Sequence, residues 1–210
     1  MVLKSSPLFD VRQVEVLRGP QGTLFGRNTT AGIVKFDSIA PSQDTSGRAT
    51  LSLGTYNTLT MDAGFGGALV EDKLSARASV MYQRRDDYVR NITTGRDLGG
   101  YQDVAARLQF LLTPSDVTSA LLNIHGRDLD GTSSLFRGNA LTRGSNKLKD
   151  NYRKRTVAYN DGDNNNQEYD GWGSSLKIDH DLGAVTLTSI TAYETTDGYS
   201  RGDTDGLPLN

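Results

Sequence analysis

In the stretch Asp103–Gly126, DVAARLQFLLTPSDVTSALLNIHG, an apolar side chain recurs at almost every second residue. Successive side chains of a β-strand point to opposite faces, so such alternation predicts strands with one apolar face. The centre, Thr113-Pro114-Ser115-Asp116, is rich in turn-forming residues and predicts a tight connection. The stretch therefore predicts two antiparallel strands. Their apolar rows are Val104, Ala106, Leu108, Phe110, Leu112 and then Ala120, Leu122, Ile124.

The same period of two recurs in five further segments, and none of the intervening chain has helical periodicity. In the last segment Val185 and Leu187 fit the pattern, but Ile190 and Ala192 break its phase, which indicates a bulge or an imperfect strand. Seven consecutive strands predict an all-β chain folded as an antiparallel meander. The five further segments are Gly47–Leu53, Thr58–Phe65, Lys73–Gln83, Trp172–His180 and Val185–Glu194.

The predicted connections alternate between short and long. Tight turns are expected at 69–72, 113–116 and 181–184, whereas 89–100 and 129–171 form long links. Successive turns of a meander lie at opposite ends of the sheet, so the tight turns share one end and the long loops the other. This asymmetry is typical of outer-membrane barrels, which have short periplasmic turns and long extracellular loops. The short turn at 54–57, on the long-loop side, is an exception.

Composition leaves two classes of β-protein open. Hydrophobic residues make up 36% of the chain, and the mean hydropathy is -0.48. Both values fit a barrel strand that is apolar on one face only, but they also fit a soluble or surface-anchored β-domain that serves adhesion or carbohydrate binding. The net charge of -2 gives no reason to expect a nucleic-acid partner. With no cysteine, disulfides and thiolate metal sites are excluded.

The residues before the meander have a different character. Two short strands, Val11–Leu17 and Gly32–Phe36, flank a stretch with three glycines and a proline, RGPQGTLFGRN, at 18–28. Such a stretch demands tight turns and positive φ angles. A linker follows at Ala40–Gln43.

The sequence VEVLRGPQGTLFG at 14–26, continued by RNTTAG at 27–32, resembles the end of the plug domain in TonB-dependent outer-membrane receptors. The segment GGALVEDKLSAR at 66–77 is similar to the first periplasmic turn and third strand of that family. The resemblance implies a receptor in the outer membrane of a Gram-negative bacterium that imports a scarce nutrient, typically a ferric siderophore. It implies the TonB complex and outer-membrane lipid as further partners.

The resemblance also implies a domain division, with the end of a plug at 1–43 and the first strands of a β-barrel at 44–210. Barrels of this transporter type have about 22 strands around a plugged lumen, so about seven strands make only a partial, open barrel. Met1–Asp10 has no apolar region of the kind found in signal peptides. We therefore expect the chain to be a fragment of a longer receptor.

The candidate site follows from the same resemblance and consists of the plug motif and its contact with the barrel. Charged residues of the motif, Glu15, Arg18 and Arg27, are expected to pair with lumen-facing residues such as Arg48, Asp62 or Arg77. The motif's glycines are expected to provide a compact chain against the wall. The full set of candidate residues is Glu15, Arg18, Gly19, Pro20, Gly22, Gly26, Arg27 and Asn28.

Other signals in the sequence are weaker. The acidic run at 161–166 does not match a calcium-binding loop, which requires Gly at position six and Glu at position twelve. The chain has two histidines, His125 and His180, far apart in sequence, and shows no Ser/His/Asp arrangement. We predict no catalytic residue, metal site or cofactor. A basic stretch between Arg143 and Arg155 is either a solvated loop or an attractor of an anionic chelate or lipopolysaccharide phosphate.

Overall fold

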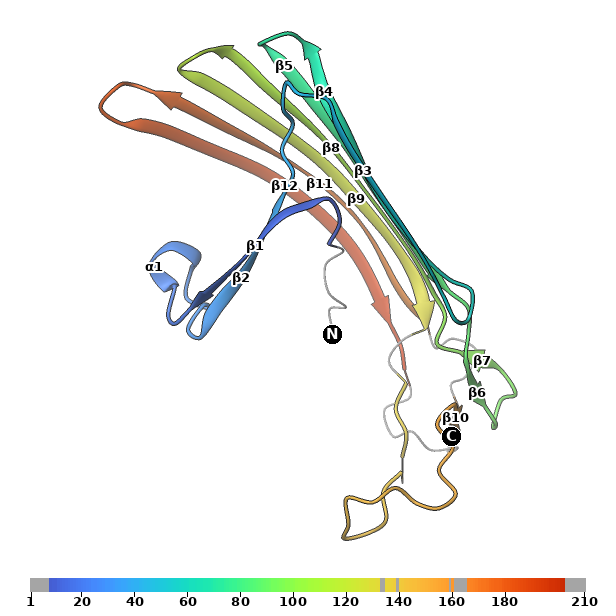
Figure 1. Cartoon of the computed structure of the whole chain (residues 1–210). Coiled ribbons are helices and arrows are strands. Elements are labelled where there is room, and N and C mark those ends of the chain that lie inside the picture. The colour runs from blue at the N-terminus through green and yellow to red at the C-terminus, as the bar shows by residue number, and fades with distance from the viewer. Residues whose placement is uncertain (1–7, 133–134, 139, 159, 161–165, 203–210) are drawn as a thin grey trace.

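The computed structural model describes residues 8–132, 135–138, 140–158, 160 and 166–202. Its main element is a curved seven-stranded sheet in the order β12-β11-β9-β8-β5-β4-β3, in which chain neighbours pair antiparallel (Figure 1). The seven predicted strands and the meander are confirmed. The strands are β3 Ser46–Gly54, β4 Thr58–Val70, β5 Leu74–Arg85, β8 Tyr101–Ser115, β9 Thr118–Thr132, β11 Asn166–Asp181 and β12 Thr186–Ser200.

The strands around the longest loop run further than their apolar patterns indicate. The β9 strand continues to Thr132 and β11 begins at Asn166, because their backbones stay paired above the last apolar residues. The β12 strand shows no register shift against β11, so the bulge considered at Ile190 and Ala192 is absent there. Both residues instead share the inward face of β12 with Thr188 and Glu194.

A smaller unit lies on the concave side of the sheet (Figure 1). The strands β1 Val11–Arg18 and β2 Gly32–Ser38 form an antiparallel hairpin, and a single helical turn, α1 Gly22–Phe25, lies within their connection. We call this unit the plug hairpin. Within the described residues, no helix has the length and apolar character needed to span a bilayer.

A third unit extends from the long-loop end of the sheet. The short strands β6 Val89–Asn91, β7 Asp97–Leu98 and β10 Thr156–Val157 form a three-stranded sheet in the order β10-β6-β7. The tight turns lie together at the opposite end of the large sheet, as the loop lengths predict (Figure 1). The short turn between β3 and β4 lies at the long-loop end, and its Tyr56 and Asn57 have positive φ angles of 61° and 51°.

In its central strands β5 and β8, the large sheet has its inward, polar face buried and its outward, apolar face more exposed, whereas β3 and β12 are exposed on both faces. The concave face of β5 carries Ser75, Arg77, Ser79 and Met81, each at most 5% exposed. On the convex face, Leu51, Phe65 and Leu108 are 66%, 65% and 39% exposed. A soluble sandwich would bury this apolar face against a second sheet, but neither of the other two sheets in the described part of the chain covers it (Figure 1). The arrangement is the one expected of a wall with lipid outside and a polar interior.

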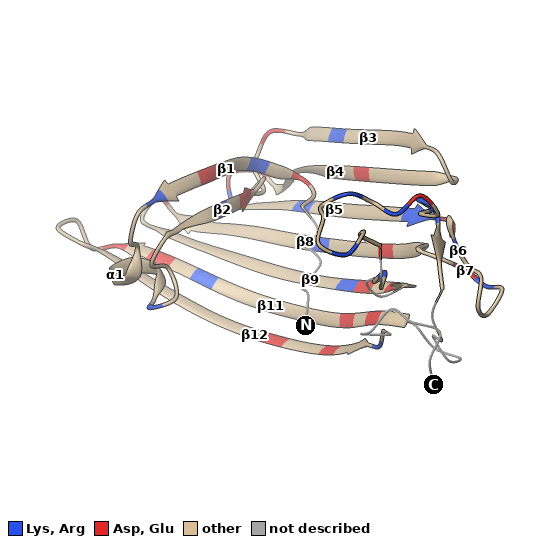
Figure 2. Ribbon diagram, turned by 90° about the horizontal axis from the view of Figure 1, so that it is seen from below, with Lys and Arg blue, Asp and Glu red and all other residues tan. Residues whose placement is uncertain are grey.

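The apolar face has a defined height. On β8 the outward residues from Val104 to Leu112 are all apolar, which spans about 27 Å along the strand and about 20 Å across a membrane at a tilt near 40°. Outward charges begin beyond this band at the long-loop end, at Arg84, Asp128 and Asp170. Figure 2 shows the strand charges as isolated bands on otherwise uncharged ribbons. We call the concave face the lumen wall.

We expect Leu108→Arg to lower the free energy of unfolding by about 2–4 kcal/mol, because it places a cation in the middle of the outward apolar band. The matched control is Gln102→Arg, on the same strand and the same face but beyond the band, where we expect a cost of about 0–1 kcal/mol. Equilibrium unfolding of the complete protein in phospholipid vesicles measures both values. Equal costs would contradict the assignment of the convex face to lipid.

Candidate functional site

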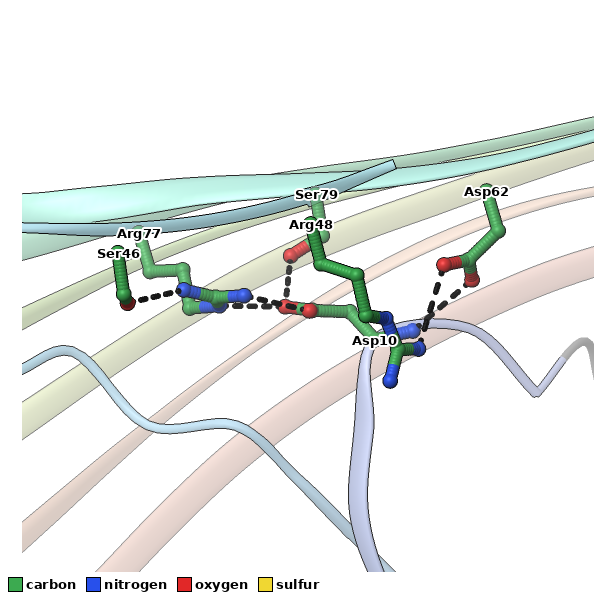
Figure 3. A network of polar contacts seen from close by, with 6 residues as sticks. All are labelled: Asp10, Ser46, Arg48, Asp62, Arg77 and Ser79. Carbon is green, nitrogen blue, oxygen red and sulfur yellow. Dashed lines mark hydrogen bonds and ion pairs between the residues drawn. The ribbon is translucent and has the colours of Figure 1, made fainter. Parts of the chain in front are cut away.

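The plug hairpin is fixed to the lumen wall by the carboxylate of Asp10, the residue directly before β1. Arg77 on β5 donates to this carboxylate from Nε and Nη2, at 2.5 and 2.6 Å. The hydroxyl of Ser79, two residues along the same strand, donates at 2.5 Å. Asp10 is 0% exposed and Arg77 is 2% exposed, so the ion pair is shielded from water (Figure 3). Such a charge-assisted, bidentate contact has high geometric specificity.

The backbone of Asp10 is bound as firmly as its side chain. Its amide donates to Oδ2 of Asp62 on β4 at 3.0 Å. Its carbonyl accepts a hydrogen bond from the amide of Ile39 at 2.9 Å, which joins the two ends of the plug hairpin. Asp10 has a φ of 51°, in the left-handed region that Asp tolerates better than most residues. The chain therefore turns sharply at Asp10 as it meets the wall.

The surrounding side chains connect this contact to three strands. Nη1 of Arg77 donates to the hydroxyl of Ser46 on β3 at 3.2 Å. Arg48 on β3 pairs with Asp62 on β4 at 3.3 Å. As a result β3, β4 and β5, the first strands of the wall, are all linked through the Asp10 network (Figure 3).

Gly64 on β4 provides the space that the carboxylate occupies. A Cβ atom at this position would lie 2.5 Å from Oδ1 of Asp10. That separation is far inside van der Waals contact, and Asp10 is held on its other side by Arg77. A side chain at position 64 would therefore displace Asp10 from the wall.

Phe9 adds an apolar contact beside the ionic one. Its ring is 4% exposed and packs with Met81 and Ala105, which form a small apolar patch on the lumen wall. The Arg107 guanidinium lies over the ring, 4.5 Å from its centre, in cation–π geometry. We call Phe9, Asp10 and their wall partners the plug anchor.

The electrostatics of the anchor keep Asp10 charged. Burial by itself would raise the pKa of the Asp10 carboxyl, but hydrogen bonds from Arg77 and Ser79, together with the charges of Arg77 and Arg48, bring the pKa below its ordinary value of 3.8. The ion pair is thus present throughout the neutral pH range.

The structure places the motif residues on the plug hairpin, away from the anchor. Glu15 pairs with Lys35 across the hairpin at 3.5 Å. Gly19 and Gly26, both with a φ of 84°, provide the positive φ angles that the sequence predicted. Gly22 begins α1, and Arg18, Pro20, Arg27 and Asn28 lie exposed around it. In the described part of the chain none of Glu15, Arg18 and Arg27 has a recorded contact with the wall. Their pairing with the barrel stays a prediction.

Two of the three wall residues expected to receive the plug, Asp62 and Arg77, do bind it through Asp10. Asp10 itself could not be predicted, because a lone Asp before a strand has no pattern that marks it as buried. The positive φ angle and the empty position at Gly64 depend on tertiary contacts.

The two histidines are the remaining candidates for catalytic or metal-binding residues, and both contact side chains of other strands. His125 pairs with Glu194 at 3.0 Å, across Gly173 of the strand between them, and Nδ1 of His180 lies 2.8 Å from the hydroxyl of Thr118. Among the described residues, no group of three or more His, Cys, Asp and Glu side chains could hold a metal ion. The acidic run at 161–166 lies, except for Asn166, outside the described residues. The site binds a segment of chain to the wall through Asp10.

We expect Asp10→Ala and Arg77→Ala each to lower the free energy of unfolding by about 3–5 kcal/mol, because each leaves an uncompensated buried charge. The double variant is expected to cost much less than the sum, since the two side chains act as a pair. Denaturant unfolding of the complete protein in vesicles provides the double-mutant cycle.

Glu15→Ala serves as the control for this cycle, because its exposed pair with Lys35 contributes little. Gly64→Ala tests the same contact without removing a charge, and should mimic Asp10→Ala. Additive single effects, or a Gly64→Ala variant with unchanged stability, would contradict the geometry of the anchor.

The anchor should weaken in acid. Because its pKa is lowered in the folded state, the Asp10 contribution is fully present above pH 3.8 and is lost as the pH falls through the lower folded value. The chain has no cysteine. A spin label at Arg12→Cys therefore reports on the turn at Asp10 without labelling of other residues of this chain. Label mobility should rise in this acid range, and Asp10→Asn should abolish the transition. A transition that persists in Asp10→Asn would assign it to another group.

No family model matches the chain. Its sequence is 29% identical to the pesticin receptor of Yersinia pestis over 110 residues, which cover 52% of this chain and 16% of that receptor. It is also 29% identical to the catecholate siderophore receptor Fiu of Escherichia coli K12 over 103 residues, which cover 48% of this chain and 13% of that receptor. The chain thus matches about a sixth of the length of the pesticin receptor and about an eighth of that of Fiu, and both relatives are receptors and not enzymes.

Solved structures agree in fold. The ferric yersiniabactin uptake receptor FyuA from Yersinia pestis matches with a TM-score of 0.75 and 21% identity, over 93% of this chain and 30% of that one. The ferric-catecholate import receptor Fiu from Escherichia coli K12 matches with a TM-score of 0.71 and 19% identity, over 90% of this chain and 29% of that one. The matched sequences and this fold together support a fragment of a TonB-dependent outer-membrane receptor, similar to the end of the plug and the first strands of the barrel.

Proposed function

We propose that this chain forms part of a receptor that imports a ferric siderophore through the outer membrane with energy delivered by TonB. The observation that carries the proposal is the plug anchor, a buried but non-covalent contact between a turn-rich hairpin and a polar lumen wall. The plug is assigned to residues 1–43 and the barrel to 44–210. This division is supported by the end of β2 at Ser38 and the start of β3 at Ser46.

The cargo is inferred from relatives. The pesticin receptor and the catecholate siderophore receptor Fiu match by sequence, and FyuA, named for ferric yersiniabactin uptake, shares the fold. Because the chain corresponds to a small share of each relative, cargo and energy source are proposals for this protein. A ferric chelate is the cargo class that the names of FyuA and Fiu have in common.

The physical character of the anchor suits a gated importer. A plug must close the barrel at rest, so it needs specific contacts with the wall, and Asp10 provides several within one residue. It must also move when the cargo passes, so these contacts must be breakable. Hydrogen bonds and ion pairs can be replaced by water once the site opens, unlike an apolar core. Glu15, Arg18 and Arg27 are proposed to form further contacts of this kind in the complete receptor.

The test is uptake of radiolabelled iron by cells that lack their own siderophore receptors and express the complete receptor. We expect uptake of at least one ferric siderophore, and we expect removal of TonB to abolish uptake while binding at the cell surface remains. Uptake that persists without TonB would contradict the energy source. Failure to take up any ferric chelate from a panel of catecholate, phenolate and hydroxamate types would contradict the cargo.

A further inference from the structure

Residues 39–45 join β2 to β3, and we call them the exit linker. At its first end, the amide of Ile39 donates to the carbonyl of Asp10 at 2.9 Å, so the exit linker starts at the plug anchor. Pro41 is buried and favours an extended backbone in the residue before it. Figure 1 shows this chain rising along the sheet from β2 to the tight-turn end, where β3 begins. The exit linker therefore runs along the wall from the anchor to the barrel.

Gln43 binds the tight turn between β4 and β5 with both its backbone and its side chain. Its carbonyl accepts a hydrogen bond from the amide of Ala68 at 3.3 Å, and its Oε1 accepts one from the amide of Asp72 at 3.1 Å. Asp72 lies in the turn itself, with a φ of 56°, and has no partner in the β4–β5 ladder. Gln43 therefore satisfies a turn amide that the sheet leaves unpaired.

The turn that receives Gln43 is fixed from its other side by β8. The hydroxyl of Thr113 donates to the carbonyl of Asp72 at 3.0 Å, and the amide of Thr113 donates to the carbonyl of Lys73 at 2.8 Å. The exit linker is thus attached to a braced part of the wall.

Gly67 on β4 lets the exit linker approach the wall closely. A Cβ atom at this position would lie 2.8 Å from Oγ1 and 3.2 Å from Cα of Thr45. A side chain at position 67 would therefore push Thr45 away from β4. We call the contacts of Gln43 and Thr45 with β4 and its turn the linker clip.

The exit linker has little slack between the plug anchor and the linker clip. Asp10 is seated at Gly64 and Gln43 is bound at Ala68. These two β4 residues are four positions apart, which is about 13 Å along a strand. The four peptide steps from Ile39 to Gln43 reach at most about 14 Å. The exit linker is therefore close to fully extended while the anchor is formed.

We propose that Gln43 is a positioning residue that keeps the plug hairpin on a short tether when the plug anchor opens. With the clip closed, the base of the released hairpin stays within about 14 Å of Gln43. With the clip open, the free chain extends to Ser46, seven steps from Ile39, and the reach rises to about 24 Å. A short tether raises the local concentration of Asp10 near Arg77, so the anchor re-forms at the same place.

The two contacts differ in kind, which allows one to open while the other stays closed. The anchor depends on the charge of Asp10, whereas the clip joins uncharged amides. A change that removes the Asp10 carboxylate therefore opens the anchor alone. The proposal rests on the proposed function only for the premise that the plug hairpin leaves the wall during import.

The test measures the distance between two spin labels by pulsed electron paramagnetic resonance, in the complete receptor without other cysteines, in vesicles. One label is at Arg12→Cys on the plug hairpin, and the other is at Asp116→Cys, an exposed position in the β8–β9 turn. Phe9→Ala/Asp10→Ala removes the side chains of the anchor and releases the hairpin without cargo or TonB. The distance distribution should be narrow in the unaltered receptor and broader in this release variant.

Gln43→Met/Gly67→Ala opens the clip. The first change removes the acceptor but keeps the length of the side chain, and the second places a methyl group against Thr45. Added to the release variant, it should widen the distribution about 1.7-fold, the ratio of the two reaches. With the anchor intact it should change nothing. Gln43→Glu, the matched control, keeps the acceptor and should keep the shorter reach, as should Ser42→Ala, whose hydroxyl bonds only within the exit linker.

Equal distributions for the open and closed clip in the release variant would overturn the role of Gln43. A wider distribution while the anchor is intact would show that the clip supports the seated plug, and would also overturn the tether. Gln43→Met alone adds no atom against Thr45 and should give an intermediate width, so the test does not depend on the double change. Since no cargo is used, a failure of import leaves these outcomes unaffected.

Discussion

The inverted polarity of the seven-stranded sheet is the constraint on which the other features depend. In a bilayer every backbone donor and acceptor must be paired within the protein, which strands achieve only by pairing side by side. The outward row of each strand must then be apolar, and the inward row is free to be polar. The concave face here carries Arg48, Asp62, Arg77 and Arg107. Any segment that closes such a lumen has to satisfy charged groups, and an apolar core cannot do so.

The plug anchor pairs with charged groups of the lumen wall at one such place. Asp10 neutralises Arg77 and is itself saturated with hydrogen bonds, while Phe9 packs on a small apolar patch of the wall at Met81 and Ala105. A contact of this type is specific because it requires an exact set of partners, but its net contribution is modest, since burial of the charges offsets much of their attraction. A plug that must stay bound to the wall at rest and detach when it is pulled needs a contact that is specific but contributes little net stability.

The small sheet of β10, β6 and β7 at the long-loop end carries charged residues beyond the membrane. Its core and its arginine–tyrosine stacking fix a basic loop on the lumen side, while carboxylates gather on the outward side of the strand ends. The wall differs in polarity between its two faces, and the strand ends beyond the apolar band carry carboxylates on the outward face, as strand parity requires. A strand that continues past the apolar band keeps its inward and outward rows, so a charge placed there has a defined direction.

The sequence by itself determined the strands, their apolar faces, the ends at which turns and loops lie, and the plug motif. These features are local, because a period of two and a cluster of glycines act through the backbone of neighbouring residues. Pairing between distant segments decided three further features. They are the strand ends beyond the apolar band, the unbroken register at Ile190 and Ala192, and the pairing of β10 with β6. Asp10 belongs to this second group. Its carboxylate is buried only because Gly64 leaves room and Arg77 lies opposite, 67 residues away in the chain. The sequence around Asp10 does not indicate this contact with Arg77 and Gly64.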